Sequence, residues 1–223
     1  MSSFNAHVKP VIAMSLIEKD GVEYYGISAD KAGETKVWNV AHLLNPEIEI
    51  KKPLMVYTPK DELVTSLSSM GHFMSLPIFG MGTSTGNISL VAIAPGTKSK
   101  EMVIGSWQAS PVSGLKQIER MEESGLVATM DSQDVRLWKF FLSDDGIKED
   151  LKATIDKSNF SDGVETQHMP TVIEWTSPHN EISIGYQTSS RVNLFDVNKL
   201  RVARSLNLKE NAQKIIKETT AVK

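Results

Sequence analysis

The sequence predicts an all-β protein built from four similar units of four antiparallel strands each. The first observation is the stretch from Pro111 to Phe141, in which three apolar runs alternate with polar residues and are separated by short polar breaks. Such alternation is typical of half-buried strands. The second is that related stretches recur along the chain. The third is that pairs such as Asp20-Gly21 and Gly86-Asn87, which favour turns, separate the runs.

The repeat is followed most easily through the large residue that ends the run D-V-R-L-W. We call the equivalent positions anchors: they are Trp38, Val91, Trp138 and Phe195. Each anchor follows a strand with a small residue at its centre, namely Gly26, Gly80, Ala128 or Gly185. The anchors are more widely spaced than the ~40–45 residues of a compact four-stranded repeat, so the units need longer loops.

Every anchor also has an apolar strand upstream and a more polar strand downstream. The upstream strands are predicted in PVIAMSLI, ELVTSLSS, PVSGLKQI and PTVIEWTS. The downstream strands are predicted in IKKPLMVYT, EMVIGSWQA, EDLKATID and LRVARSLNL, and their polarity indicates the exposed outer edge of each unit. The four units are expected near residues 8–57, 62–108, 112–156 and 169–208, within one repeat region spanning residues 1–207.

The pattern changes after Asn207. In residues 208–223 the apolar residues Leu208, Ala212, Ile215 and Ile216 recur at helical spacing, and Asn207 is a candidate N-cap. The sequence therefore predicts a short amphipathic C-terminal helix that is peripheral to the strands.

Composition excludes several classes of function. The chain has 223 residues, a net charge of −3 and no cysteine, which removes disulfides, thiolate nucleophiles and cysteine-based zinc sites. Its charge gives no overall attraction to nucleic acid or anionic membranes. No apolar run approaches the ~20 residues of a membrane span, and the N-terminus lacks the pattern of a secretory signal. We therefore expect a cytoplasmic or nuclear protein.

The apolar run, the polar turn and the sequence D-V-R-L-W together resemble the core of a WD40 repeat, one blade of a β-propeller. The resemblance covers nearly the whole chain and implies blades of four antiparallel strands. The chain departs from the family where Trp38-Asn39 and Trp138-Lys139 replace the Trp-Asp dipeptide. It is similar to a divergent member.

In WD40 repeats a His, a Ser or Thr, an Asp and the Trp form a buried hydrogen-bonded tetrad. The resemblance implies a first copy formed by His7, Ser28, Asp30 and Trp38. It implies a partial third copy formed by Thr129, Asp131 and Trp138, with Gln108 in place of the His. The second and fourth repeats lack the tetrad residues.

The resemblance raises a question of blade number, because WD40 propellers usually close with seven blades and four would leave open edges. Unpaired edge strands favour pairing with another chain. The alternatives are a fragment of a longer propeller, a partial propeller completed by a partner, or further blades that the pattern does not reveal. We favour the first.

No catalytic constellation is recognisable. The five histidines, His7, His42, His72, His168 and His179, form no i, i+4 pair and have no carboxylate at metal-ligand spacing. The glycine-rich run from Gly80 to Thr83 precedes a strand, so it offers no helix N-terminus to a phosphate. We therefore expect no catalytic residues, no metal site and no cofactor.

The resemblance and the lack of catalytic groups together predict a non-catalytic protein–protein interaction scaffold, as a subunit of a larger assembly. Alternatives are a substrate adaptor of a ubiquitin ligase, disfavoured because W-D-x-R is absent, and an enzyme on a propeller scaffold. Protein partners are expected, and direct contact with nucleic acid or membrane is not. Candidate partner-binding residues lie in the loops between strands: Lys60, Asp61, Gln108, Phe160 and His168.

Overall fold

The structure of the protein is a computed structural model. It describes residues 5–19, 23–40, 52–59, 61–73, 75–94, 103–121, 125–143, 146–156, 169–176, 180–187 and 191–209. Predicted features outside these ranges include Lys60, Phe160, His168 and the tail from residue 210 onward.

The described chain forms four antiparallel sheets of four strands each. Sheet 1 contains β1 (Val11–Lys19), β2 (Glu23–Asp30), β3 (Thr35–Asn39) and β4 (Met55–Tyr57). Sheet 2 contains β5 (Val64–Phe73), β6 (Leu76–Thr83), β7 (Asn87–Ala92) and β8 (Val103–Gln108). Sheet 3 contains β9 (Gln117–Arg120), β10 (Leu126–Met130), β11 (Val135–Ser143) and β12 (Gly146–Ile155). Sheet 4 contains β13 (Pro170–Thr176), β14 (Glu181–Tyr186), β15 (Arg191–Asp196) and β16 (Arg201–Asn207).

Each sheet is a meander in which strands adjacent in sequence are paired, so the predicted all-β architecture of four-stranded units is confirmed. One predicted strand was too long. The run PVSGLKQI was expected to be a strand throughout, but β9 begins only at Gln117. Residues 111–116 instead form a loop, because the amides of Val112 and Ser113 donate to the Ser110 hydroxyl at 3.3 and 3.2 Å. These bonds curl the backbone locally instead of extending it.

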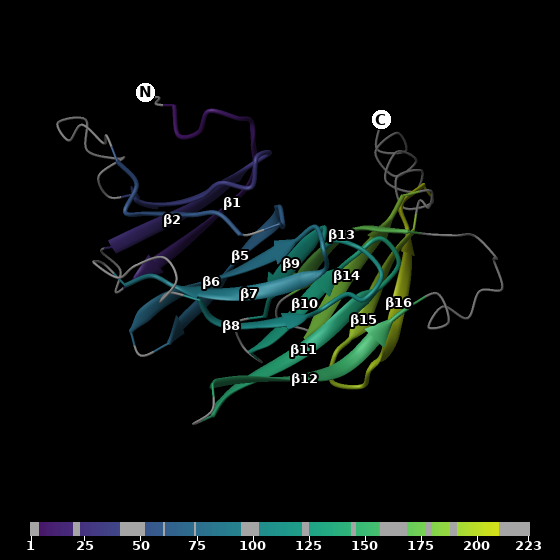
Figure 1. The fold of residues 1–223 in the computed structure, drawn as a ribbon. Helices are drawn as coiled ribbons and strands as arrows, with labels where there is room; N and C mark the ends of the chain where they lie inside the picture. The colour runs from purple at the N-terminus through teal and green to yellow at the C-terminus, as the bar shows by residue number, and fades with distance from the viewer. Residues whose placement is uncertain are drawn as a thin grey trace, which may run out of the picture.

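The four sheets lie side by side in chain order, with the first and last at opposite sides of the molecule (Figure 1). The first strands of successive sheets are neighbours, β1 beside β5, β5 beside β9 and β9 beside β13. We call these four the inner strands. One apolar cluster joins sheets 1 and 2, a second joins sheets 2 and 3, and a third joins sheets 3 and 4. No such cluster within the described ranges joins sheet 4 to sheet 1. The arrangement is β-propeller-like.

All four anchors lie in the third strand of their sheets. Val91, Trp138 and Phe195 are buried and belong to the clusters that their sheets share with the preceding sheet. Because side chains alternate across a strand, one face of each sheet points toward the preceding sheet and the other toward the next. We call the face that carries the anchor the anchor face.

The interface between sheets 2 and 3 shows how aromatic residues fill this space. Trp107 of β8 meets the anchor Trp138 edge to face, with ring centroids 6.2 Å apart. Phe140 lies 6.3 Å from the same Trp107 ring. Edge-to-face packing of this kind adds to the stabilisation from burial itself.

After β16, Asn207 Oδ1 accepts a hydrogen bond from the Lys209 amide at 3.1 Å, which is the contact of an N-cap. The tail beyond residue 209 lies outside the described residues, so the predicted helix stays a prediction. Within the described ranges no helix is long and apolar enough to cross a membrane.

Trp138→Ala is expected to lower the free energy of unfolding by about 3–5 kcal/mol, because it empties the centre of the interface between sheets 2 and 3. Denaturant unfolding followed by tryptophan fluorescence and circular dichroism measures the change. Phe141→Ala is the matched control, since Phe141 lies on the same strand and is 46% exposed. Equal effects of the two substitutions would contradict the assigned packing.

Candidate functional site: two polar networks and the loop rim

In sheet 1, four polar side chains meet beside the start of β1. His7 Nε2 lies 2.7 Å from Ser28 Oγ, and Trp38 Nε1 donates to the same oxygen at 3.0 Å. His7 Nδ1 lies 3.3 Å from a carboxylate oxygen of Asp30. When Ser28 donates to Nε2, Nδ1 carries the proton and faces Asp30, but it forms no hydrogen bond there. These are the contacts that the WD40 resemblance implies for a first tetrad.

Asp30 also closes the turn between β2 and β3. Its Oδ1 accepts hydrogen bonds from the amides of Ala32 and Glu34 at 2.8 and 3.1 Å. Burial by itself raises the pKa of Asp30, but these two bonds and the nearby His7 outweigh it, so the pKa lies below its usual value.

Oxygen and nitrogen atoms of His7, Asp30 and Glu34 lie within 4.8 Å of one another, which is the spacing of a metal site. However, Glu34 and His7 Nε2 already have partners within the protein, while His7 Nδ1 faces the Asp30 carboxylate at 3.3 Å without forming a hydrogen bond. Lys36 Nζ lies 2.6 Å from Glu34, and His7 Nε2 is engaged by Ser28. We therefore assign the cluster a structural role in joining the N-terminal segment to sheet 1.

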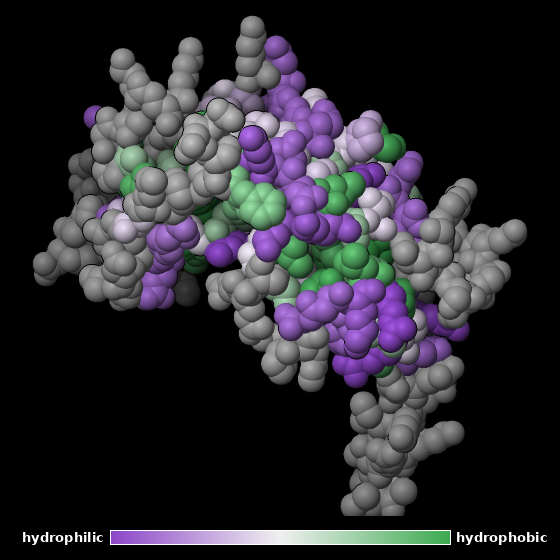
Figure 2. All heavy atoms as spheres, turned by 90° about the horizontal axis from the view of Figure 1, so that it is seen from below, coloured by the Kyte–Doolittle hydropathy of each residue, from purple (hydrophilic) through white to green (hydrophobic). Residues whose placement is uncertain are grey.

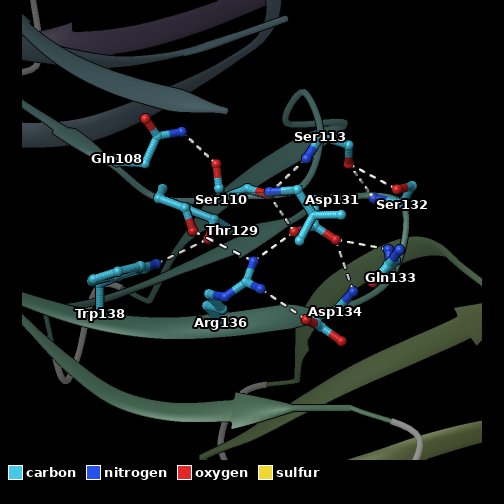
Figure 3. A network of polar contacts seen from close by, with 12 residues as sticks. Gln108, Ser110, Ser113, Thr129, Asp131, Ser132, Gln133, Asp134, Arg136 and Trp138 are labelled. Atoms are coloured by element: carbon cyan, nitrogen blue, oxygen red, sulfur yellow. Dashed lines mark hydrogen bonds and ion pairs between the residues drawn. The ribbon is translucent and has the colours of Figure 1, made fainter. Parts of the chain in front are cut away.

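A second network holds the turn between β10 and β11 (Figure 3). Asp131 Oδ1 accepts from the amides of Gln133 and Asp134 at 2.7 and 2.8 Å, as Asp30 does in sheet 1. Its other oxygen accepts from Ser110 Oγ at 2.6 Å and from Arg136 Nη1 at 2.5 Å. Asp131 is completely buried, so its charge is compensated entirely by these groups.

Two further hydrogen bonds connect this network to Thr129 and to Asp134. Trp138 Nε1 donates to Thr129 Oγ1 at 2.9 Å, reproducing the Trp–Ser contact of sheet 1. Arg136 Nη2 donates to Asp134 at 2.8 Å. Burial is the main cause that raises the pKa of Asp134, and it outweighs the opposing charge of Arg136. For Asp131, burial again raises the pKa, but hydrogen bonds from Ser110, two amides and Arg136 bring it below its usual value.

The expected role of Gln108 in this network is wrong. Gln108 does not contact Asp131; its Nε2 donates to the carbonyl oxygen of Thr85 at 3.0 Å and to that of Ser110. Ser110 occupies the position expected for Gln108 and bonds Asp131 directly. The sequence pattern missed Ser110 because the alternation of apolar and polar residues does not predict the path of a loop. That path brings Ser110 over the turn between β10 and β11.

The networks lie where the inner strands begin, and there the loops of neighbouring sheets are tied together. We call this region the loop rim; it comprises residues 61–63, 83–87, 108–115 and 131–134. Leu63 and Ser84 exchange two hydrogen bonds, at 2.8 and 3.1 Å. Between sheets 2 and 3, the Leu115 amide donates to the Thr83 carbonyl at 3.0 Å. Within sheet 3, Ser113 Oγ, before β9, lies 2.8 Å from Ser132 Oγ in the turn between β10 and β11.

Gly86 shows how closely these loops approach. It has a φ of +88°, and a Cβ there would overlap the carbonyl oxygen of Ser110. That carbonyl lies so close because the amides of Ala109 and Ser110 both donate to the Gly86 carbonyl, at 3.0 and 2.9 Å. The rim is therefore held in one conformation by main-chain bonds between loops.

Two apolar side chains are exposed on this otherwise polar rim. Leu63 is 45% exposed and Val112 is 53% exposed. Both belong to segments whose main chain is fixed by the bonds described above, so their positions are preorganised. Sequence reasoning missed both residues, because each follows a strand-like pattern that suggests burial.

The predicted partner-binding residues divide into two groups. Asp61 and Gln108 lie on the rim, and Asp61 is exposed with a φ of +63°. Gln108 is exposed as well, but its amide group is committed to the two carbonyls named above. Lys60, Phe160 and His168 lie outside the described residues, so their predicted role stays a prediction.

A cavity of about 490 Å³ lies at the opposite ends of the inner strands. Ser69, Gly71 and His72 of β5 line it together with Glu18 of β1 and Arg120 of β9. The Arg120 guanidinium fills the place where a Cβ of Gly71 would lie, and Gly71 adopts a φ of +79°. The lining thus combines the acidic side chain of Glu18 with the guanidinium of Arg120 and the imidazole of His72.

The molecular surface seen from below carries both hydrophobic and hydrophilic residues. Figure 2 shows hydrophobic residues as a band between hydrophilic ones on the half of the molecule away from sheet 1.

No protein family model matches the chain, and no curated protein resembles it closely enough to be matched. Solved structures do resemble it. Raptor from Chaetomium thermophilum is one, with a TM-score of 0.58 and 12% identity. The likeness covers 87% of this chain but only 16% of that protein. At this identity the comparison supports the fold and nothing more.

Asp131→Asn is expected to lower the free energy of unfolding at pH 7 by about 1.5–3 kcal/mol, because Arg136 loses a buried charged partner. The pKa of Asp131 is lower in the folded than in the unfolded state, so its ionised carboxylate stabilises the fold at pH values above the unfolded-state pKa of ~3.9. This stabilisation is lost as the pH falls through the folded-state pKa. The wild-type melting temperature should therefore fall more steeply between about pH 5 and pH 2 than that of the variant.

Asp150→Asn is the control, because Asp150 is an exposed carboxylate paired with Lys152 at the outer edge of sheet 3. It should change stability by less than about 1 kcal/mol and leave the pH profile parallel to that of the wild type. Parallel profiles for Asp131→Asn would show that Asp131 is not stabilised as described.

Proposed function

We propose that this protein is a non-catalytic interaction scaffold of the divergent WD40-repeat type, and that it binds a protein partner through the loop rim. The observation that carries the proposal is the rim itself. Its loops are fixed to one another by main-chain hydrogen bonds, and it presents Leu63 and Val112 to solvent.

The WD40 assignment is supported by the repetition of one polar arrangement. In sheets 1 and 3, an Asp closes the turn after the second strand and bonds a residue that precedes the first strand. In both, the anchor Trp donates to a hydroxyl on the second strand. Sheet 3 departs from the family in using Ser110 where a His is usual, and Arg136 supplies the positive charge.

The rim has the properties that favour binding. Ordering a flexible loop costs free energy on association, and a rim already held by hydrogen bonds avoids most of that cost. Interfaces derive much of their affinity from a few well-placed apolar side chains surrounded by polar groups. Leu63 and Val112 are such side chains, with the polar residues Asp61 and Ser113 on the same loops.

Leu63→Asp/Val112→Asp is expected to reduce co-purifying partners at least tenfold in affinity capture of the tagged chain from its native source. The physical reason is that two apolar contacts are replaced by charges that a partner surface must desolvate. Quantitative mass spectrometry of the captured proteins provides the measurement. Circular dichroism and the melting temperature should match the wild type, because both side chains are already exposed.

Leu151→Asp serves as the matched control, since Leu151 is 46% exposed but lies at the outer edge of sheet 3, away from the rim. It should retain every stoichiometric partner. The proposal fails if the wild-type chain captures no protein, or if the rim variant and the control retain partners equally.

A further inference from the structure

The cavity at the ends of the inner strands opposite the loop rim contains polar side chains that have no partner. Glu18, Ser69, His72 and Arg120 line it. Within the described ranges none of these four side chains forms a hydrogen bond or an ion pair. At the loop rim, by contrast, polar side chains such as Asp131 are bonded within the chain. The two ends of the inner strands therefore differ in how far their polar groups are satisfied.

The lack of a partner matters most for Arg120. This residue is half-buried on β9, and its cross-strand partner Val127 belongs to the cluster between sheets 2 and 3, so its side chain points toward sheet 2. A guanidinium carries a permanent positive charge and several hydrogen-bond donors. Holding such a group partly out of water without a counter-charge costs free energy. The position is therefore suited to an anionic ligand.

The main chain of β5 makes room for this guanidinium. The register between β5 and β6 shifts between Ser69 and Gly71, so Met70 is an extra residue and forms a bulge. Gly71 follows with a φ of +79°, and a Cβ there would overlap Arg120 Nη1. A residue with a side chain would be strained at this φ and would displace the guanidinium. Gly71 thus leaves the space that Arg120 occupies.

A second cavity, of about 180 Å³, adjoins the first. His72 and Arg120 line both cavities. The other side chains that line the smaller cavity come from sheets 2 and 3 and are apolar: Met70, Ile78, Leu90, Ile104, Phe140 and Ile147. An apolar cavity of about 150 Å³ is large enough to hold benzene. The smaller cavity therefore accepts an apolar group of the size of a phenyl ring.

We propose that the two adjoining cavities form a binding site for an apolar carboxylate. Its carboxylate group is bound by Arg120, with Ser69 and His72 as further donors in the same cavity, and its apolar group lies between sheets 2 and 3. The planar guanidinium matches a carboxylate with two parallel hydrogen bonds. Glu18 in the same cavity repels a second negative charge, so a singly charged carboxylate fits better than a phosphate.

This chemistry is shared by small organic acids and by the C-terminus of a peptide that ends in an apolar residue. The site lies at the opposite ends of the inner strands from the loop rim. The proposal therefore does not depend on partner binding through the rim.

Isothermal titration calorimetry of the purified full chain with 3-phenylpropionate tests the proposal. We expect saturable binding of one molecule per chain. The neutral 3-phenylpropionamide should bind at least tenfold more weakly, because it offers Arg120 no charge. Acetate should also bind at least tenfold more weakly, because it places no apolar group between sheets 2 and 3.

Arg120→Gln should weaken the binding of 3-phenylpropionate at least tenfold. Its melting temperature without ligand should not fall, because the guanidinium has no partner within the described chain to lose. Arg120→Lys keeps the charge but not the planar fork, so its loss of affinity should be smaller. Arg201→Gln is the matched control, since Arg201 is exposed on β16 and lies outside both cavities. The control and the loop-rim variant should bind the acid as the wild type does.

The tripeptide N-acetyl-glycyl-glycyl-phenylalanine, with a free or an amidated C-terminus, distinguishes the two sources of the carboxylate. At least tenfold tighter binding of the free peptide than of 3-phenylpropionate identifies a peptide C-terminus, and equal or weaker binding identifies a small acid. The proposal is overturned if 3-phenylpropionate shows no saturable binding, if its amide binds equally well, or if Arg120→Gln binds it as the wild type does.

Discussion

The structure depends on the packing of each sheet between its neighbours. Strand alternation gives every sheet two faces, and in sheets 2 and 3 both are apolar because both are covered. The anchors are the large residues on one face of each sheet that fill the space between it and the preceding sheet. Val91, Trp138 and Phe195 differ in size, and side chains of the neighbouring sheet pack against them, as Trp107 does against Trp138. The polar networks are secondary to this packing, because they fix loops whose positions the sheets have already set.

The same constraint explains why the sequence was informative about the fold. A sheet covered on both sides needs apolar or small residues on both faces of its middle strands, whereas its outer edge strand carries more polar residues. Residues 201–207, which mix Arg, Ser and Asn with apolar residues, were recognisable as the polar outer strand of sheet 4. The four anchors could be matched from the sequence alone, because each lies in the third strand of its sheet, paired with the second.

The sequence was less informative about the loops. Pro111 to Lys116 alternates like a strand but forms a loop, because the Ser110 hydroxyl competes for its amides. The path of this loop also places Ser110, and not Gln108, beside Asp131. The hydrogen bonds that join Ser110 to Asp131 and Leu63 to Ser84 each link residues 21 positions apart, and no local sequence pattern carries that information. The 71% exposure of Met14 could not be predicted either, because the run PVIAMSLI has the pattern of a buried strand.

The linear order of the sheets has a consequence for how the molecule opens. Among the described residues the apolar clusters join neighbouring sheets, so cooperativity passes along the chain from one sheet to the next, as in other repeat proteins. Sheets 2 and 3 are held on both sides, whereas sheets 1 and 4 are each held on one. Amide hydrogens of β6, β7, β10 and β11 should therefore exchange with solvent most slowly, and those of sheets 1 and 4 should exchange through local opening that leaves the centre intact.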